Sequence, residues 1–275
     1  MSNANPWLPR ASCDESCVRL EPVGACGSVV RVVRRIVRTL LVLTVLPAIP
    51  LLAIPQPGQA RLVRWYCWVV LRCMGVRITK SGGPIRNVPG VLVVSPHMSW
   101  VDALVINALM SGNFVAKAEL IGWPGLGLMA RLMNVIPIDR TRLRRLPEVV
   151  GTVAERLRSG RTVVAFPEGT TWCGLAHGNF RPAIFQAAID AGRPVQPLRL
   201  SYHRRDGRPS TIPAFVGDDT LLSSFLRVVS APPIVAHVHV EELQLPGEHR
   251  RDLAQRCQEA VRNTAPALHE HALAA

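Results

Sequence analysis

A run of 17 residues without a formal charge, from Thr39 to Pro55, constrains what this chain can fold into more than any other feature of its sequence. A helix needs about 17 to 25 apolar residues to cross the hydrocarbon core of a bilayer, so the run is at the lower limit for a span. Pro47 and Pro50 stand in its middle, where each removes a backbone donor and favours a kink. The run therefore predicts a helix that spans a membrane or dips into one and bends back.

Basic residues flank the uncharged run on both sides. Those before it are Arg31, Arg34, Arg35 and Arg38, and those after it are Arg61, Arg64, Arg72, Arg77 and Lys80. Segments rich in lysine and arginine stay on the cytoplasmic side of a membrane, so both ends of the run are expected there. We therefore favour a re-entrant or interfacial hairpin at the cytoplasmic face over a single crossing.

The second half of this hairpin, residues 61–74, has the pattern of an amphipathic helix. One face carries Arg61, Arg64, Trp65, Trp68 and Arg72, and the other carries Leu62, Val63, Tyr66, Val70 and Met74. Arginine and tryptophan together are typical of a helix at the level of anionic lipid headgroups. The alternative is an ordinary amphipathic helix that covers the core.

The chain has 32 Lys and Arg against 19 Asp and Glu, and its formal net charge of +13 favours a polyanionic partner. Nucleic acid, anionic lipid and a phosphorylated substrate all fit this condition. The sequence has no helix-turn-helix, RNA-recognition or zinc-finger pattern, and its two tyrosines and six phenylalanines offer few rings for stacking on bases. We therefore expect anionic membrane lipids as a partner and no nucleic acid.

The seven cysteines form no C-x-x-C pair, and their odd number predicts free thiols in a reducing compartment. Cys13, Cys17 and Cys26 are near one another in an irregular leader, residues 1–28. That stretch has no histidine and no fourth cysteine to complete a tetrahedral zinc site. We therefore expect no metal site.

Short β-branched runs alternate with helical patterns over the rest of the chain, which predicts an α/β fold. Strands are expected at residues 91–95, Asn134–Ile138, Thr162–Phe166 and Pro194–Ser201, and helices at Leu146–Ser159 and Ala183–Ala191. Gly160 and Gly192 stand where helix C-caps belong, because glycine adopts the left-handed conformation without steric cost.

The segment SPHMSWVD places His97 at the mouth of a predicted strand and Asp102 five residues later. A turn that leads into a helix can bring the Asp102 carboxylate to the His97 ring. An imidazole whose Nδ1 is held by a carboxylate can take a proton from an alcohol at Nε2. Ser99 is a weaker candidate nucleophile, because the G-x-S-x-G context is absent. The pair therefore predicts a general base oriented by a carboxylate.

Two further strand ends carry polar groups. In AFPEGTTW a predicted strand ends at Phe166, Pro167, Glu168 and Gly169, and the hydroxyls and backbone donors of Thr170 and Thr171 can line an anion or diol site. NVIPIDR delivers Asp139 and Arg140 to the edge of the sheet where α/β proteins place ligands. A plain β-turn and a surface ion pair are the alternatives.

In this order, the motifs resemble those of the glycerolipid acyltransferase family of 1-acylglycerol-3-phosphate acyltransferases. The family's marks are H-x4-D, a strand that ends in an acid-arginine pair, F-P-E-G-T and a later V-x-P strand. In this chain the four marks correspond, in the same order, to the pair His97 and Asp102, the pair Asp139 and Arg140, Phe166–Thr170, and Val195–Pro197. The resemblance implies a glycerol-phosphate acyltransferase-like fold, with a mixed central sheet flanked by helices and an N-terminal membrane-associating helical hairpin.

The resemblance also implies transfer of a fatty acyl group from acyl-CoA or acyl carrier protein to the hydroxyl of a lysophospholipid, foremost 1-acylglycerol-3-phosphate, in phospholipid biosynthesis. No metal or redox cofactor is needed. His97 is then the base, Glu168 and Gly169 shape the acceptor site, and backbone donors within 166–170 stabilise the oxyanion. Intact His97 and Asp102 argue against a scaffold that has lost its activity.

The same resemblance implies that two residues bind the negative charge of the acceptor: Arg140, and Lys117 in FVAKAELIGWPGLG. The family's third motif usually continues with an arginine, and this chain has Thr171 there. Either Arg140, Lys117 or Arg181 supplies the missing charge, or the acceptor is another lyso-lipid, such as a lyso-ornithine lipid.

Four segments follow from these patterns. Residues 1–28 are expected to be an irregular leader, 29–80 the basic and apolar membrane-associating helices, 81–262 the catalytic domain and 263–275 a C-terminal tail. The expected location is the cytoplasmic face of a membrane.

Overall fold

The structure, a computed structural model, describes residues 9–18, 25–52, 54, 56–84, 88–118, 135–139 and 143–262. Within this part of the chain, seven strands form one sheet in the order β1-β7-β6-β2-β5-β3-β4. The strands are β1 Val76–Gly82, β2 Leu92–Val94, β3 Asn113–Lys117, β4 Ile136–Ile138, β5 Val163–Ala165, β6 Val195–Arg204 and β7 Ile234–Val240. Only β6 and β7 pair antiparallel, so the predicted α/β fold with a mixed sheet is confirmed.

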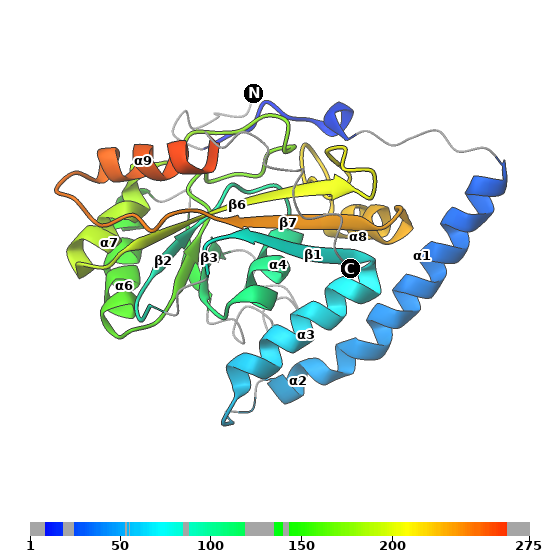
Figure 1. The fold of residues 1–275 in the computed structure, drawn as a ribbon, viewed down its shortest axis with the longest axis horizontal. Coiled ribbons are helices and arrows are strands. Elements are labelled where there is room, and N and C mark those ends of the chain that lie inside the picture. Colours follow the sequence, from blue (N-terminus) through cyan, green and yellow to red (C-terminus); the bar gives the residue numbers. More distant parts are fainter. Residues whose placement is uncertain are drawn as a thin grey trace.

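Helices cover both faces of the sheet (Figure 1). The longer helices are α1 Ala25–Val45, α3 Gln59–Met74, α4 Val101–Leu109, α6 Leu146–Arg158, α7 Phe185–Ala191, α8 Leu221–Ser230 and α9 Arg250–Arg262. The short ones are η1 Glu15–Cys17, η2 Leu46–Ala48, α2 Ile49–Leu52, η4 Leu143–Arg145 and η5 Pro182–Ile184. Helices α3, α4 and α8 pack on one face, and α6, α7 and α9 pack on the other.

The central strand β2 shows how the two apolar cores form. Val93 is fully buried against the first group of helices, and its neighbours Leu92 and Val94 are fully buried against the second. Successive side chains of a strand point to opposite faces, so a continuous apolar run is what a strand covered on both sides needs. This places β2 in the middle of the sheet and fixes the segment that follows it at the carboxyl edge.

The predicted elements match the observed ones with small differences at their ends. The expected strands correspond to β2, β4, β5 and β6, although Asn134 lies outside the described residues. The predicted helix Ala183–Ala191 begins as a 3-10 turn, η5, and becomes α-helical only at Phe185. Gly160 and Gly192 have φ angles of 78° and 61°, so both predicted left-handed caps are confirmed.

The N-terminal helices form a hairpin in which α1 and α3 pack side by side (Figure 1). The Tyr66 hydroxyl on α3 donates a hydrogen bond of 3.1 Å to the Val45 carbonyl at the end of α1. The 3-10 turn η2 interrupts the helix at Pro47, where the sequence predicts a kink. Gly27–Leu52 is long and apolar enough to cross a membrane by length and composition, the one such helix among the residues described.

Two elements cross the expected segment boundaries. Helix α1 starts at Ala25, inside the expected leader. The helical hairpin ends at Met74, because the residues from Val76 form β1, which pairs with β7. Residues 9–18 also pack onto the catalytic domain, where Cys13 is buried in its core.

Candidate active site

His97 follows β2 in a short loop that leads into α4, and its ring meets Asp102 on the first turn of that helix. His97 Nδ1 lies 2.9 Å from Asp102 Oδ2. The Asp102 side chain is fully buried, whereas the His97 side chain keeps 18% exposure. The predicted pairing is therefore present, with the imidazole open to a substrate and the carboxylate closed off from water.

Asp102 is held by four hydrogen bonds. Its Oδ2 atom accepts the His97 contact and the backbone N–H groups of Met98 and Ser99, at 2.7 and 2.8 Å. Its Oδ1 atom accepts the Tyr202 hydroxyl at 2.7 Å. Both Asp102 oxygens act as acceptors in these contacts, so His97 carries its proton on Nδ1 and presents a lone pair at Nε2.

Tyr202 is a site residue that the sequence patterns did not indicate. It lies on β6, where burial and the neighbouring Asp102 carboxylate raise its pKa well above 10. The phenol therefore stays protonated and keeps donating to Asp102. Leu198, Leu200 and Tyr202 alternate along β6 and join the same core as α4, which is the one signal in the sequence that could have placed Tyr202 there.

Glu168 braces the backbone of the site. Its Oε2 atom accepts the His97 N–H at 2.7 Å, and its Oε1 atom accepts the Gly178 N–H at 3.0 Å. Burial raises the pKa of Glu168 to about 7, although both hydrogen bonds and the charge of Arg262 oppose the shift. Both carboxylate oxygens are thus occupied by the chain itself, and Glu168 positions His97.

Phe166, at the end of β5, lies against the His97 ring. The two rings stack with centroids 3.9 Å apart and planes 11° from parallel. The next residues turn sharply: Gly169 N–H donates to the Phe166 carbonyl at 3.1 Å, and Gly169 has a φ angle of 75°. A Cβ atom there would lie 2.9 Å from Pro9 Cγ, so both backbone angle and space require glycine.

The rest of this loop is tied to its neighbours by backbone bonds. Pro167 accepts the Arg181 N–H at 3.0 Å, and the Trp172 N–H donates to the His97 carbonyl at 2.8 Å. The Thr171 hydroxyl donates to the Phe215 carbonyl. The hydroxyl of Thr171, which replaces the family's usual arginine, is therefore used in a hydrogen bond within the protein.

The candidate charge-binding residues lie further along the carboxyl edge. Lys117 is exposed at the end of β3, in register with Ile138 at the end of β4, and the half-buried Asp139 follows directly. Arg181 is exposed, and its side chain packs next to Gly169. Arg140 lies outside the described residues. Lys117 and Asp139 thus lie at the ends of two paired strands, and Arg181 lies beside the loop after β5.

A solvent-accessible imidazole, oriented by a buried carboxylate at the carboxyl edge of an α/β sheet, defines a class of enzyme that deprotonates a substrate hydroxyl. A family model described as Acyltransferase matches residues 77–201. The fold is similar to the 1-acyl-sn-glycerophosphate acyltransferase PlsC from Thermotoga maritima, with a TM-score of 0.62 and 19% identity over 85% of this chain and 95% of that one.

Two curated relatives are more similar in sequence. A lyso-ornithine lipid O-acyltransferase from Pseudomonas aeruginosa is 34% identical over 211 residues, which is 75% of this chain and 79% of the relative. A 1-acyl-sn-glycerol-3-phosphate acyltransferase from Neisseria meningitidis serogroup B is 35% identical over 57% of this chain and 62% of that protein. This chain belongs to the acyltransferase family and is an O-acyltransferase.

Proposed function

We propose that the protein transfers a fatty acyl group from acyl-CoA or acyl carrier protein to the free hydroxyl of a lysophospholipid, with 1-acylglycerol-3-phosphate as the first candidate. The observation that carries this proposal is the contact of 2.9 Å between His97 Nδ1 and a fully buried Asp102. It leaves Nε2 as a base on an accessible ring, which is what acyl transfer to an alcohol requires.

The reaction then needs one proton relay. His97 Nε2 takes the proton from the acceptor hydroxyl, whose oxygen forms a bond to the thioester carbonyl carbon. The tetrahedral intermediate collapses as its C–S bond breaks, and the proton passes from His97 to the leaving sulfur. Asp102 stabilises the imidazolium that exists between these two steps.

The oxyanion of that intermediate needs backbone donors near His97. The Gly169 N–H already donates to the Phe166 carbonyl within its turn. Of the two neighbouring amides of Gly169 and Thr170, the Thr170 N–H is therefore the one left for the oxyanion. One preorganised donor of this kind contributes about 10²- to 10³-fold in rate. We assign this role to Thr170.

The acceptor's phosphate would bind between the exposed Arg181 and Lys117. A guanidinium offers a planar fork for two phosphate oxygens, and the ammonium adds a point charge. A lyso-ornithine lipid is the second candidate acceptor. It is favoured by Thr171, whose hydroxyl is bound to Phe215 and which brings no charge to the position of the family's arginine.

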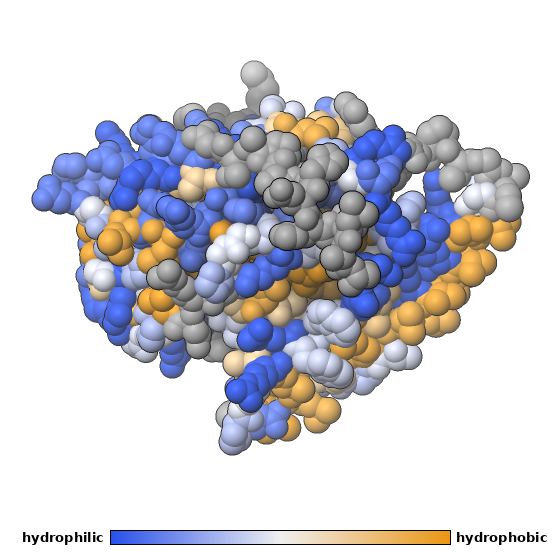
Figure 2. Space-filling view, viewed as in Figure 1, coloured by the Kyte–Doolittle hydropathy of each residue, from blue (hydrophilic) through white to orange (hydrophobic). Residues whose placement is uncertain are grey.

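Membrane binding is the second part of the proposal. Helix α1 exposes an apolar face, visible in orange along its length in Figure 2. Its exposed large apolar residues are Val29, Val30, Val32, Val33, Ile36, Val37, Leu40, Leu41 and Leu43. Burying such a face in the acyl-chain region removes it from water, so α1 would insert into the leaflet.

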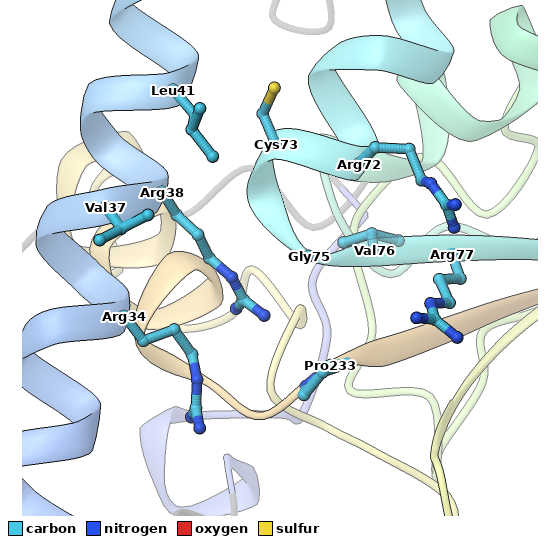
Figure 3. A pocket seen from close by; sticks show the side chains of 10 residues that line it. All are labelled: Arg34, Val37, Arg38, Leu41, Arg72, Cys73, Gly75, Val76, Arg77 and Pro233. Atoms are coloured by element: carbon cyan, nitrogen blue, oxygen red, sulfur yellow. The ribbon is translucent and has the colours of Figure 1, made fainter.

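A basic cavity of about 390 Å³ lies next to this face, between α1, α3 and the start of β1 (Figure 3). It is lined by Arg34, Arg38, Arg72 and Arg77 together with Val37 and Leu41, and no acidic residue is among its described lining residues. Four guanidinium groups beside an apolar helix suit the phosphate of an anionic lipid. The hairpin would therefore dock on the cytoplasmic leaflet.

An acceptor comparison tests the proposal. Purified full-length protein is assayed with 1-acylglycerol-3-phosphate and with a lyso-ornithine lipid, each with the same acyl-CoA and then with the same acyl carrier protein. We expect turnover of the glycerophosphate and an increased Michaelis constant for it in Arg181→Ala. Arg161→Ala, an exposed arginine just before β5 at the opposite edge of the sheet, is the matched control and should leave that constant unchanged.

Each outcome of the comparison separates the acceptors. Turnover of the lyso-ornithine lipid alone would replace the first candidate by the second, and Thr171→Arg should then shift preference toward the glycerophosphate. Absence of acyl transfer to either acceptor from either donor would contradict the proposed function.

A further inference from the structure

Three cysteines, two from the N-terminal segment and one from the loop after β5, meet beside the active site. The sulfur atoms of Cys13, Cys17 and Cys173 all lie within 4.8 Å of one another. Cys13 and Cys173 are buried, and Cys17 is half-buried. Cys13 and Cys17 alone are too few for a metal site in the sequence, and the fold brings Cys173 to them from the loop after β5.

The local backbone holds these sulfurs in place. Asp14 caps η1 by accepting the Ser16 N–H at 3.0 Å, and the 3-10 turn that follows brings Cys17 back toward Cys13. On the other side, Cys173 lies in the loop after β5, next to Trp172, whose N–H donates to the His97 carbonyl at 2.8 Å.

We infer that Cys13, Cys17 and Cys173 bind a single thiophilic cation, zinc, with water at the fourth position. Zinc–sulfur bonds are about 2.3 Å, so two thiolates on one tetrahedral zinc stand about 3.8 Å apart, which the observed separations allow. On binding, the three thiols release three protons and form three metal–sulfur bonds. A disulfide would use only two of the three converging sulfurs.

The ion would tie the N-terminal segment 9–18 to the active-site loop. Pro9 of that segment already packs on Gly169, and Trp172, next to Cys173, donates its N–H to the His97 carbonyl. A metal bridge at this point would therefore stabilise the loop that supports His97. This site is independent of which acceptor the enzyme uses.

Metal analysis of the full chain tests the inference. Protein from cells grown with zinc is purified in reductant without chelator, and metals are measured by mass spectrometry. We expect about one zinc per chain in the wild type and less than a tenth of that in Cys173→Ser. Cys73→Ser, which changes a half-buried cysteine on α3 outside the cluster, is the matched control and should keep its zinc.

A second readout covers the case in which Cys173→Ser fails to fold. Cys17→Ser changes the least buried ligand, and the wild type loaded with cobalt should show thiolate-to-metal charge-transfer absorption that this variant has lost or weakened. Zinc-loaded wild type should also unfold at a higher temperature than stripped protein. A reduced wild type that binds no zinc, a disulfide among the three cysteines, or full zinc in Cys17→Ser would overturn the inference.

Discussion

The N-terminal hairpin and the active site differ in which groups they bury and which they expose. Helix α1 leaves its apolar side chains exposed, whereas its Arg34 and Arg38 donate to the carbonyls of Ser230 and Ala231 at the end of α8. The active site instead encloses a carboxylate, Asp102, at 0% exposure and satisfies it with four hydrogen bonds.

This contrast indicates two different environments. Exposed apolar surface on one long helix is costly in water and is removed by a lipid phase, so α1 is suited to a membrane. A buried charge is tolerated only with a full set of donors, so the His97–Asp102 pair is suited to chemistry in a closed site. We therefore expect substitutions in the hairpin to reduce membrane binding alone, and substitutions in the active site to reduce kcat alone.

Replacing the orienting carboxylate should have the largest effect. Asp102→Asn keeps the size of the side chain but turns a donor toward the surrounding N–H groups and favours the wrong His97 tautomer. We expect kcat to fall by about 10⁴-fold, as the same change does in a Ser-His-Asp triad. Steady-state kinetics check this, and a change confined to the Michaelis constant would contradict the orienting role.

A charge on the apolar face should have the next largest effect, and on membrane binding only. Leu40→Asp places a carboxylate in the expected acyl-chain region at a cost of about 2.5 to 3.5 kcal/mol, which corresponds to a loss of about 10²-fold in partitioning. Liposome flotation measures it. Leu245→Asp, an equally exposed leucine outside the hairpin, is the control, and equal loss in both variants would refute a dedicated membrane face.

Removing one donor from Asp102 should have a smaller effect. Tyr202→Phe deletes a hydrogen bond to a buried charge, which is worth about 1.5 to 3 kcal/mol, and we expect kcat to fall about tenfold. Tyr66→Phe removes the hydroxyl that joins α3 to α1 and serves as the counterpart in the hairpin. If Tyr66→Phe lowered kcat as much as Tyr202→Phe, the two regions would not be independent.

The smallest expected effect concerns stability and pH. The pKa of Glu168 is raised from 4.5 to about 7 by burial, so the folded chain binds more protons than the unfolded chain between these values. The unfolding free energy should therefore fall as the pH rises through this window, by up to about 1.4 kcal/mol per unit from this group. Chemical denaturation of the wild type and Glu168→Gln measures the difference in slope.

Glu148→Gln is the matched control for that experiment, because this glutamate is exposed at the start of α6. Its slope should equal that of the wild type. A Glu168→Gln variant with the wild-type slope would mean that Glu168 is not the group that titrates.

Local patterns were enough to predict much of the fold and the centre of the site. His97 and Asp102 lie within one turn of chain, so their spacing alone predicts their contact. Tyr202 and Cys173 come from distant segments, and no local pattern tells which buried residue will meet which loop. Phe166 was expected to contribute backbone donors, and its ring is what contacts His97.

The boundaries of the hairpin were harder to predict, because helix ends depend on tertiary contacts. Residues 76–80 continue the basic character of the hairpin, yet their backbone pairs with β7 and belongs to the sheet. The fold of residues 9–18 depends on packing against a loop more than 150 residues away, which composition does not reveal.

The central claim is that His97 supplies the base while the hairpin alone supplies membrane affinity. It is tested most directly by His97→Ala reconstituted on anionic liposomes, with flotation and acyl transfer measured on the same preparation. We expect unchanged flotation and acyl transfer reduced by at least about 10³-fold, within the range that general base catalysis provides. Turnover above a tenth of the wild-type rate by the bound variant would contradict the account.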